Sequence, residues 1–330
     1  MLISEIGEVE LIKRLTQDIS PDPEVVVIGI GDDAAAVRPS EDKLQLITKD
    51  VLVEEIHFLR GTISPWQLGR KSLAVNISDI AAMGGIPRHL LTAAAMPSNT
   101  EVEWIEEFYR GMKDLCRTYS INLIGGDTVR SPRGITISIT LFGEVERERM
   151  LVRSGAREGD LVAVTGFLGA SAAGLELLLR GQTSQDEWEK EVLKAHLEPP
   201  VRLTETRIIS GSGMVTSMID LSDGLYKDIG EICSASGVGA RINAHRLPIS
   251  DATRRVCGHL KLDQVSLAVS GGEDYELLFT FPEENLAGMK DLLKEQFTVI
   301  GKIVSQEEGF KVVDSQGKET QLTRKGFDHF

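Results

Sequence analysis

The chain has 330 residues, of which 42% are hydrophobic and 26% are charged, so it can bury one large core or two ordinary ones, and we expect two domains. Its formal net charge of −14 and the lack of any basic run argue against nucleic acid as a partner, because such binding needs Lys and Arg to neutralise phosphates. Anionic substrates would need a divalent cation held by carboxylates, although a merely solubilising acidic surface is the simpler alternative.

Apolar runs typical of strands alternate with helical patterns in the first half, which predicts a mixed α and β architecture. We expect strands at residues 25–28, 44–48, 90–95 and 135–141, the last with isoleucine and leucine alternating with hydroxyl residues. We expect a helix at residues 66–84 that Gly84 and Gly85 end. A capping box of Thr100 and Glu103 predicts the start of a second helix, which continues to Tyr119.

A polar stretch at residues 146–160 separates this half from a second α/β pattern. We place the boundary near Met150, which gives an N-terminal ATP- and Mg-binding dimerisation domain, 1–150, and a C-terminal α/β domain completing the site, 151–330. The second half is expected to contain strands at 161–165, 214–219, 275–281 and 298–304, and helices at 170–180, 222–234 and 283–296.

Cys116, Cys233 and Cys257 lie far apart, so they predict neither a disulfide framework nor a zinc site and are interpreted as buried thiols. The first residues lack a basic segment followed by an apolar one, and no apolar stretch approaches the length of a membrane span. We therefore expect a cytoplasmic enzyme with no membrane partner.

Acidic residues recur beside the predicted strands. The first run contains Gly29, Gly31 and Ala34 at the spacing of a dinucleotide fingerprint, but Asp32 and Asp33 would repel a pyrophosphate unless a metal ion came between them. An NAD-binding loop stays open as a weak alternative. With Mg²⁺ present, Asp33 becomes a candidate ligand.

Further aspartates follow later apolar runs, and one lies on the 66–84 helix, away from its apolar stripe. They are Asp50, Asp79, Asp127, Asp220 and Asp223. Each alone is more often a solvated turn or surface residue. Together they predict a carboxylate ring for several Mg²⁺ ions on a polyphosphate, where strand ends meet.

Familiar phosphate-binding motifs are absent from the sequence. The Gly-Lys pairs at Gly301 and Gly317 are not followed by Ser or Thr, which excludes a Walker A loop, and there is no H-R-D kinase loop. Phosphate binding would then depend on metal ions, Arg153, the amides around Gly126 and Ser222 at a predicted helix start.

Eight segments in this order resemble the thiamine-monophosphate kinase branch of the aminoimidazole-ribonucleotide synthetase-like ATP-binding superfamily. They are Gly29-Ile-Gly-Asp-Asp-Ala34, Asp50 with His57-Phe58, Asn76-Ile-Ser-Asp-Ile-Ala-Ala-Met-Gly84, Leu123-Ile-Gly-Gly-Asp-Thr128, Arg153-Ser-Gly155, Ile219-Asp-Leu-Ser-Asp-Gly-Leu225, Ser270-Gly-Gly-Glu-Asp-Tyr-Glu276 and Gly326-Phe-Asp-His-Phe330. The last segment distinguishes this branch from its relatives.

The resemblance implies a two-domain subunit, a homodimer formed through the N-terminal sheets, and direct transfer of the ATP γ-phosphoryl group to thiamine phosphate, with no covalent nucleophile. By position it implies Mg²⁺ ligands at Asp33, Thr48, Lys49, Asp50, Asp79, Asp127, Asp220 and Asp223. It implies ATP contacts at Tyr109, Gly126, Asp127, Arg153 and Ser222. It implies contacts to thiamine phosphate at His57, Glu273 and Phe327, of which the aromatic and the carboxylate suit a cationic ring.

One position departs from the family pattern, because relatives usually carry a small hydroxyl residue where this chain has Lys49. A main-chain carbonyl ligand would survive the change, whereas a hydroxyl ligand would be lost. Other functions also stay open. These are another member of the superfamily acting on a different phosphorylated or amide substrate, and a non-catalytic scaffold that binds Mg-nucleotide. A selenophosphate synthetase is disfavoured because no cysteine precedes Cys116.

Overall fold

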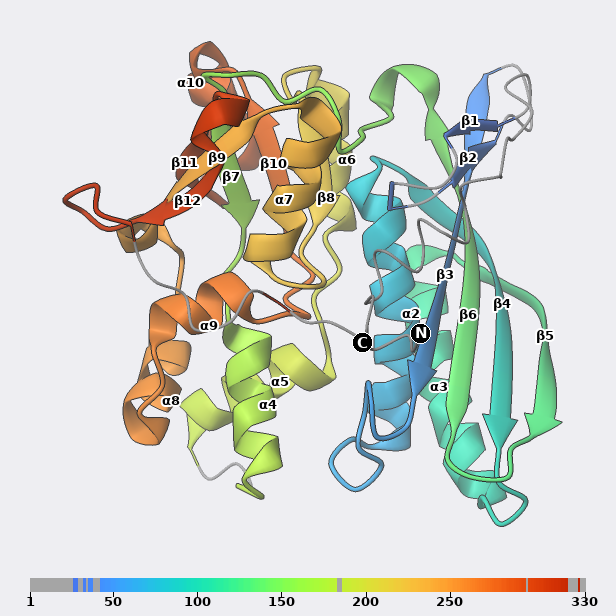
Figure 1. Cartoon of the computed structure of the whole chain (residues 1–330). Coiled ribbons are helices and arrows are strands. Elements are labelled where there is room, and N and C mark those ends of the chain that lie inside the picture. The colour runs from blue at the N-terminus through green and yellow to red at the C-terminus, as the bar shows by residue number, and fades with distance from the viewer. Residues whose placement is uncertain are drawn as a thin grey trace, which may run out of the picture.

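Two six-stranded sheets, one in each half of the chain, organise the protein (Figure 1). The computed structural model describes residues 26–28, 32–33, 35–37, 42–182, 186–294, 296–319 and 326. The first sheet has the spatial order β1 (Val26–Ile28), β2 (Ala35–Val37), β3 (Lys43–Val53), β6 (Thr136–Glu146), β4 (Ile86–Met96) and β5 (Asn122–Arg130). Its neighbours are antiparallel except β4 and β5, which run parallel.

Strand β6 shows why this sheet has one buried and one open face. Ile137, Ile139 and Leu141 are buried, while the hydroxyl residues between them stay partly exposed, as the alternation in the sequence predicts. The buried face packs against α2 (Pro65–Ala82) and α3 (Val102–Tyr119). On the other face, Val51 of β3 and Leu91 of β4 are exposed.

Helix α3 forms as predicted, but its predicted cap is wrong. The helix begins after Glu101, and no side chain caps it. The amide of Thr100 instead donates to the carbonyl oxygen of Pro97 at 3.0 Å, which closes a turn. Because the turn holds Thr100 back from the cap position, its hydroxyl is buried without a hydrogen-bond partner in the described part of the chain.

Helix α2 is the central element of the molecule, and Figure 1 shows it between the first sheet and the C-terminal half. Ser64 and Gln67 form a reciprocal capping box at its start, with Pro65 in its first turn. Gly84, at a φ of +77°, and its hydrogen bond to Ala81 end the helix, as the sequence predicts. Ser72 and Asn76 are fully buried, so the burial of α2 extends well beyond its apolar stripe.

The second sheet has the order β12 (Phe310–Val313), β9 (Gly239–Asn243), β11 (Phe297–Val304), β7 (Leu161–Thr165), β10 (Leu277–Phe281) and β8 (Ser217–Asp220). It is antiparallel apart from the β12–β9 pair. The predicted strands are confirmed, although β8 begins at Ser217, later than residue 214, and β10 begins at Leu277.

Helices cover both faces of the second sheet. Helices α7 (Leu225–Ser236) and α9 (Gln264–Ser270) pack on one core, and α6 (Leu203–Ser212) and α10 (Leu286–Leu293) pack on another. A separate cluster joins α4 (Ala170–Leu179), α5 (Glu187–Leu197) and α8 (Asp251–Leu260). Four single-turn 3₁₀ helices complete the described elements: η1 (Arg147–Arg149), η2 (Ala244–Arg246), η3 (Glu283–Asn285) and η4 (Gln306–Glu308).

Polar contacts from α6 join the two halves. The hydroxyl of Thr206 donates to the carbonyl oxygen of Ala81 at 3.1 Å, and Arg207 donates to the carbonyl oxygen of Gly84 at 2.9 Å. Met150 lies between η1 and β7, and the domain boundary placed there stays a prediction. Among the described helices, none combines the length and the apolar character that a membrane crossing requires.

Candidate active site

Three buried or partly buried aspartates meet where the two halves of the chain join. Asp33, Asp79 and Asp220 each offer a carboxylate oxygen, and these oxygens lie within 4.8 Å of one another. Asp33 follows β1, Asp79 lies on α2, and Asp220 is the last residue of β8. The cluster therefore takes ligands from both sheets and from the helix between them.

Neighbouring side chains fix the orientation of these carboxylates. The hydroxyl of Thr48 donates to Asp79, and the hydroxyl of Ser78 donates to Asp220 at 2.6 Å. Arg153 donates to Asp33 at 2.6 Å through its guanidinium group. The second carboxylate oxygen of Asp33 is buried and has no hydrogen-bond partner among the described atoms, which leaves it available to a ligand.

The electrostatics of the cluster favour a bound cation. Burial, and then the charge of Asp220, raise the pKa of Asp33 to about 8, and these effects outweigh the guanidinium of Arg153. Burial and the neighbouring carboxylates also raise the pKa of Asp79 well above its usual value. Without a cation these acids repel one another. An all-oxygen donor set with an unpartnered carboxylate oxygen fits Mg²⁺.

Asp50 belongs beside this cluster, whereas the side chain of Lys49 does not. Asp50 shares a face of β3 with buried Thr48, and its amide donates to Asn76 at 3.2 Å. Burial, followed by the charge of Asp220, raises the pKa of Asp50 to about 6. Lys49 is exposed on the opposite face of the strand, so only its main-chain carbonyl remains as a candidate ligand.

The expectation that these aspartates occupy loops at strand ends is wrong for two of them. Asp50 lies inside β3 and Asp127 lies inside β5. Both sheets are mainly antiparallel, so the site does not form at one row of parallel strand ends. It forms instead where α2 faces β3 on one side and β8 on the other.

Asp127 lies apart from the acidic cluster. It is exposed on the edge strand β5, where its carboxylate accepts from the amide of Thr128 at 2.8 Å. Gly126 lets β5 approach β4 closely, because a Cβ there would be 1.9 Å from the carbonyl oxygen of Thr92. A hydrogen bond from Thr128 reaches Tyr109 on α3. Gly126 and Thr128 thus lie on the same face of β5 as Tyr109, whereas strand alternation places the side chain of Asp127 on the opposite face, and the roles of these residues stay predictions.

Ser222 and Asp223, predicted to contact ATP and Mg²⁺ respectively, lie in the segment before α7. Asp223, with 42% of its side chain exposed, pairs with Lys227 at 3.3 Å. Ser222 accepts the amide of Glu273 through its main-chain oxygen at 2.7 Å. Gly326 packs against Asp223 and Lys227. Phe327 lies outside the described residues, as do Gly29, Gly31 and Ala34.

His57 and Glu273 come together near Lys71 of α2. Nδ1 of His57 accepts the amide of Val53 at 3.0 Å, so the proton of the neutral ring is on Nε2. Burial raises the pKa of Glu273, but Lys71, His196 and His57 together outweigh burial and hold this pKa below its usual value. Glu273 is therefore an ionised carboxylate.

Sequence reasoning missed Tyr275, although it lies within one of the quoted motifs. Glu273 and Tyr275 have φ values of +63° and +49°, a left-handed conformation that non-glycine residues rarely adopt. Burial raises the pKa of Tyr275, and so do Glu273, Asp50, Asp220 and Asp79, which places its hydroxyl near both groups of acids. Such backbone strain is typical of functional sites, but no sequence pattern reveals it.

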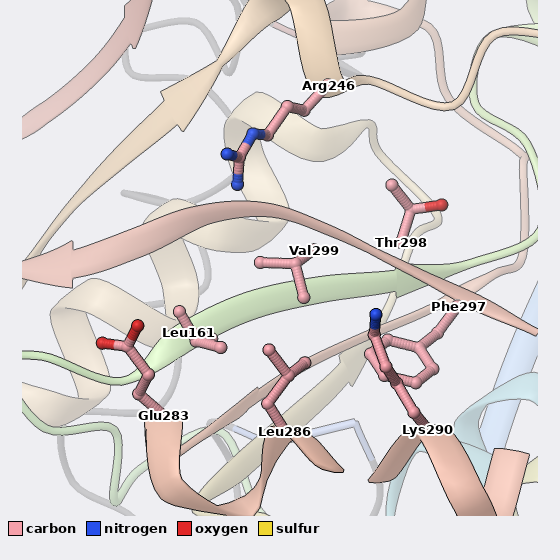
Figure 2. Close-up of a pocket in the computed structure, with 8 residues that line it drawn as sticks. All are labelled: Leu161, Arg246, Glu283, Leu286, Lys290, Phe297, Thr298 and Val299. Atoms are coloured by element: carbon pink, nitrogen blue, oxygen red, sulfur yellow. The ribbon is translucent and has the colours of Figure 1, made fainter. Parts of the chain in front are cut away.

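A separate hollow of about 460 Å³ lies in the C-terminal half (Figure 2). Its apolar lining includes Leu161, Leu286 and Phe297, and its charged lining includes Arg246 and Lys290. It contains none of the residues predicted for the site, so the acidic cluster and the Glu273 region remain the candidate active site.

Comparisons with known proteins identify the class of protein first. The family model "AIR synthase related protein, N-terminal domain" matches residues 31–145, and "AIR synthase related protein, C-terminal domain" matches residues 157–314. This fold and its acidic cluster define a two-domain AIR synthase related protein.

Full-length relatives narrow the class. The thiamine-monophosphate kinase of Escherichia coli K12 is 41% identical over 98% of both chains, and that of Aquifex aeolicus is 37% identical over 100% of both. A solved structure described as "AaThiL complexed with AMPPCP and TMP" matches with a TM-score of 0.88 at 36% identity, covering 100% of this chain and 99% of the other. The chain belongs to the thiamine-monophosphate kinase family.

Proposed function

We propose that this protein transfers the γ-phosphoryl group of ATP to thiamine phosphate and releases thiamine diphosphate and ADP. The observation that carries the proposal is the match to a solved relative that holds both AMPPCP and TMP, at a TM-score of 0.88 over the whole chain. AMPPCP is a non-hydrolysable analogue of ATP, so that complex has the two substrates of a direct phosphoryl transfer.

The acidic cluster is proposed to hold Mg²⁺ through Asp33, Asp79 and Asp220. Asp50, Asp223, Thr48 and the main-chain carbonyl of Lys49 are proposed as further ligands, and Asp127, which lies apart from the cluster, is proposed as a ligand of a separate Mg²⁺ ion. Bound Mg²⁺ would neutralise charge on the phosphates and stabilise the transferring group. The open oxygen of Asp33 and the raised pKa values of the cluster support this assignment.

ATP is proposed to contact Tyr109, Gly126, Asp127, Arg153 and Ser222. Arg153 is well suited to phosphate, because Asp32 and Asp33 hold its guanidinium beside the metal cluster and keep it charged. Only 18% of its side chain is exposed, so its position is restricted before substrate binds.

Thiamine phosphate is proposed to contact His57, Glu273 and Phe327. His57 can donate through Nε2 because its Nδ1 already accepts a main-chain amide. The ionised carboxylate of Glu273 complements a cationic ring or an aminopyrimidine. A phosphate oxygen of the acceptor attacks directly, so these residues bind and orient, and no protein nucleophile is needed.

We also propose a homodimer formed through the open face of the first sheet, where Val51 and Leu91 are exposed. The cytoplasm is the proposed location, because ATP is the proposed donor and all three cysteines are free and buried. The domains at 1–150 and 151–330 are retained as the proposed division.

The decisive experiment incubates purified protein with ATP and Mg²⁺ against a panel of phosphate monoesters and identifies products by mass. We expect thiamine diphosphate and ADP in equal amounts, with Mg²⁺ required. Turnover of a different monoester in the panel would favour another activity within the superfamily. ATP binding without any product would support a non-catalytic scaffold and contradict the proposal.

A further inference from the structure

A buried lysine links the two halves of the chain next to the proposed acceptor site. Lys71 lies in α2 and is only 1% exposed. Its Nζ donates to the carbonyl oxygen of His196 and to Oε2 of Glu273, both at 3.0 Å. Lysines are almost never fully buried unless they are paired, so this position requires an explanation.

Glu273 is held from several directions. Nδ1 of His196 lies 3.2 Å from the same Oε2 that Lys71 contacts, and 3.0 Å from the hydroxyl of Ser171. The hydrogen bond between Nδ1 and the hydroxyl of Ser171 holds the imidazole ring beside this carboxylate. A hydrogen bond from the amide of Glu273 to the carbonyl oxygen of Ser222 holds the left-handed backbone of Glu273 in place. Few other orientations remain open to this carboxylate.

Lys71 and Glu273 differ in their access to ligands. The side chain of Glu273 is 28% exposed, whereas that of Lys71 is 1% exposed. A bound acceptor can therefore meet Glu273 but not Lys71. Lys71 can influence the acceptor only through the carboxylate that it holds.

We propose that Lys71 is a positioning residue for the acceptor: it reaches from α2 across the junction of the two halves and holds Glu273 ionised and correctly oriented. This inference rests on the proposed function of Glu273 as an acceptor contact. His196 supports the same carboxylate from α5. The contact between the two halves of the chain therefore completes the acceptor site as well as the acidic cluster.

The charges around Glu273 show what the loss of Lys71 would do. Lys71 faces it from α2, His196 from α5 and His57 from the segment after β3, while Asp274 and Tyr275 flank it in its own segment. The pKa of His196 is lowered to about 4, mainly by burial, so Lys71 is the principal cation near neutral pH. Without it, burial would raise the pKa of Glu273 and favour a neutral carboxyl group.

The test replaces Lys71 by Met, which has a similar length but no charge. For Lys71→Met we expect the KM for thiamine phosphate to rise at least about tenfold, while the KM for ATP stays within about twofold. The KM for thiamine phosphate should also increase as the pH is lowered from about 8 to about 6, whereas the parent changes little. In Lys71→Met/Glu273→Gln this pH dependence should disappear.

The matched control is Lys190→Met, because Lys190 also pairs with a glutamate, Glu187, but is 52% exposed. It should leave both KM values unchanged. An acceptor KM in folded Lys71→Met equal to that of the parent would overturn the inference. So would equal increases in both KM values with no pH dependence.

Thermal stability separates this inference from the proposed function. If the parent did not phosphorylate thiamine phosphate, the function would be wrong. The pairing would still be tested by the melting temperatures of Lys71→Met, Glu273→Gln and the double variant. We expect the double variant to be more stable than Lys71→Met, since it leaves no unpaired buried charge. If the fall in melting temperature of the double variant equalled the sum of the falls in the two single variants, the pairing would be overturned.

If Lys71→Met did not fold, Lys71→Arg would replace it. A raised KM for thiamine phosphate is expected for this variant, and an unchanged KM would contradict the inference.

Discussion

At the scale of single residues, removing the charge of Asp50 is the most direct test of Mg²⁺ binding by the acidic cluster. Asp50→Asn keeps the size of the side chain but removes a negative charge next to the proposed Mg²⁺ site. We expect turnover to fall on the order of a hundredfold and the Mg²⁺ concentration needed for half-maximal rate to rise. Steady-state kinetics over a range of Mg²⁺ concentrations would measure both effects.

The internal control for this substitution is Asp42→Asn. Asp42 is exposed and precedes β3, away from the cluster. Activity and Mg²⁺ dependence should stay as in the parent. Near-normal turnover of Asp50→Asn at limiting Mg²⁺ would rule out a role for this carboxylate in metal binding.

The sequence identifies the aspartates proposed for the site but does not predict which of them lie close together in the structure. The structure brings Asp33, Asp79 and Asp220 together, and Asp50 beside them, while Asp127 lies apart on β5. Asp79 follows Asp33 by 46 positions and Asp220 follows Asp79 by 141, so only the packing of α2 against both halves determines which acids meet. No pattern in the sequence indicated that Lys71 is buried beside the site, because a lysine inside a helix is ordinarily solvated.

At the scale of elements, two glycines set the contact between α2 and α3. A Cβ on Gly69 would lie 1.9 Å from the carbonyl oxygen of Phe108, and one on Gly111 would lie 1.9 Å from that of Trp66. Gly69→Ala should therefore push the helices apart and destabilise the protein by about 1–3 kcal/mol, despite the better helix propensity of alanine. Denaturant unfolding would measure the loss.

Gly230→Ala provides the opposite case within α7, because nothing lies within 4 Å of a Cβ built there. It should stabilise the protein by up to about 1 kcal/mol through helix propensity alone. Equal effects of Gly69→Ala and Gly230→Ala would contradict close packing of α2 on α3.

The open face of the first sheet leads to a prediction about assembly. Val51 is 42% exposed on β3, and an aspartate there would be buried without a partner if a second copy covered this face. Light scattering at micromolar concentration should give a dimer for the parent and a monomer for Val51→Asp. Val102→Asp, at an equally apolar and 63% exposed position on α3, should remain dimeric. A monomeric parent would contradict the proposed dimer.

Most elements follow from local patterns in the sequence. The alternation of β6 predicts its strand closely because only one face of β6 is buried. The continuous apolar run of β7 predicts its strand because both faces of β7 are buried. Strand β5 was missed because Gly125, Gly126 and Asp127 are typical of turns, and its parallel pairing with β4 overrides that preference. The predicted capping box of α3 is wrong for a similar reason, because Thr100 takes part in the turn that begins at Pro97.

At the scale of the whole molecule, the acidic cluster should make stability depend on pH and metal together. The pKa of Asp33 is raised to about 8, so above the unfolded pKa the folded state holds more protons than the unfolded one, and stability falls as pH rises. The slope reaches up to about 1.4 kcal/mol per pH unit for each such group. The window from about pH 6.5 to about 8 leaves out His196, whose lowered pKa moves its contribution to lower pH, although Asp274 also titrates in this window.

Melting temperatures without metal should therefore fall between these two pH values. Saturating Mg²⁺ should raise the melting temperature more at the higher pH, where the cluster is ionised. Asp274, whose pKa burial also raises to about 8, would leave a slope that Mg²⁺ does not remove. Asp220→Asn should reduce the response to Mg²⁺. A response of equal size at both pH values would show that the cluster does not take up the metal.

The position of α2 has a consequence for the exchange of its backbone hydrogens with solvent. Residues Leu68 to Ala82 are mostly buried, with one sheet on one side and the C-terminal half on the other. An amide in α2 can exchange only after its helix opens, and that opening requires release from both neighbours at once. In deuterated water, the amides of α2 should keep their protons longer than those of α3, which has solvent along one side, and the slowest of them should report the global stability of the protein.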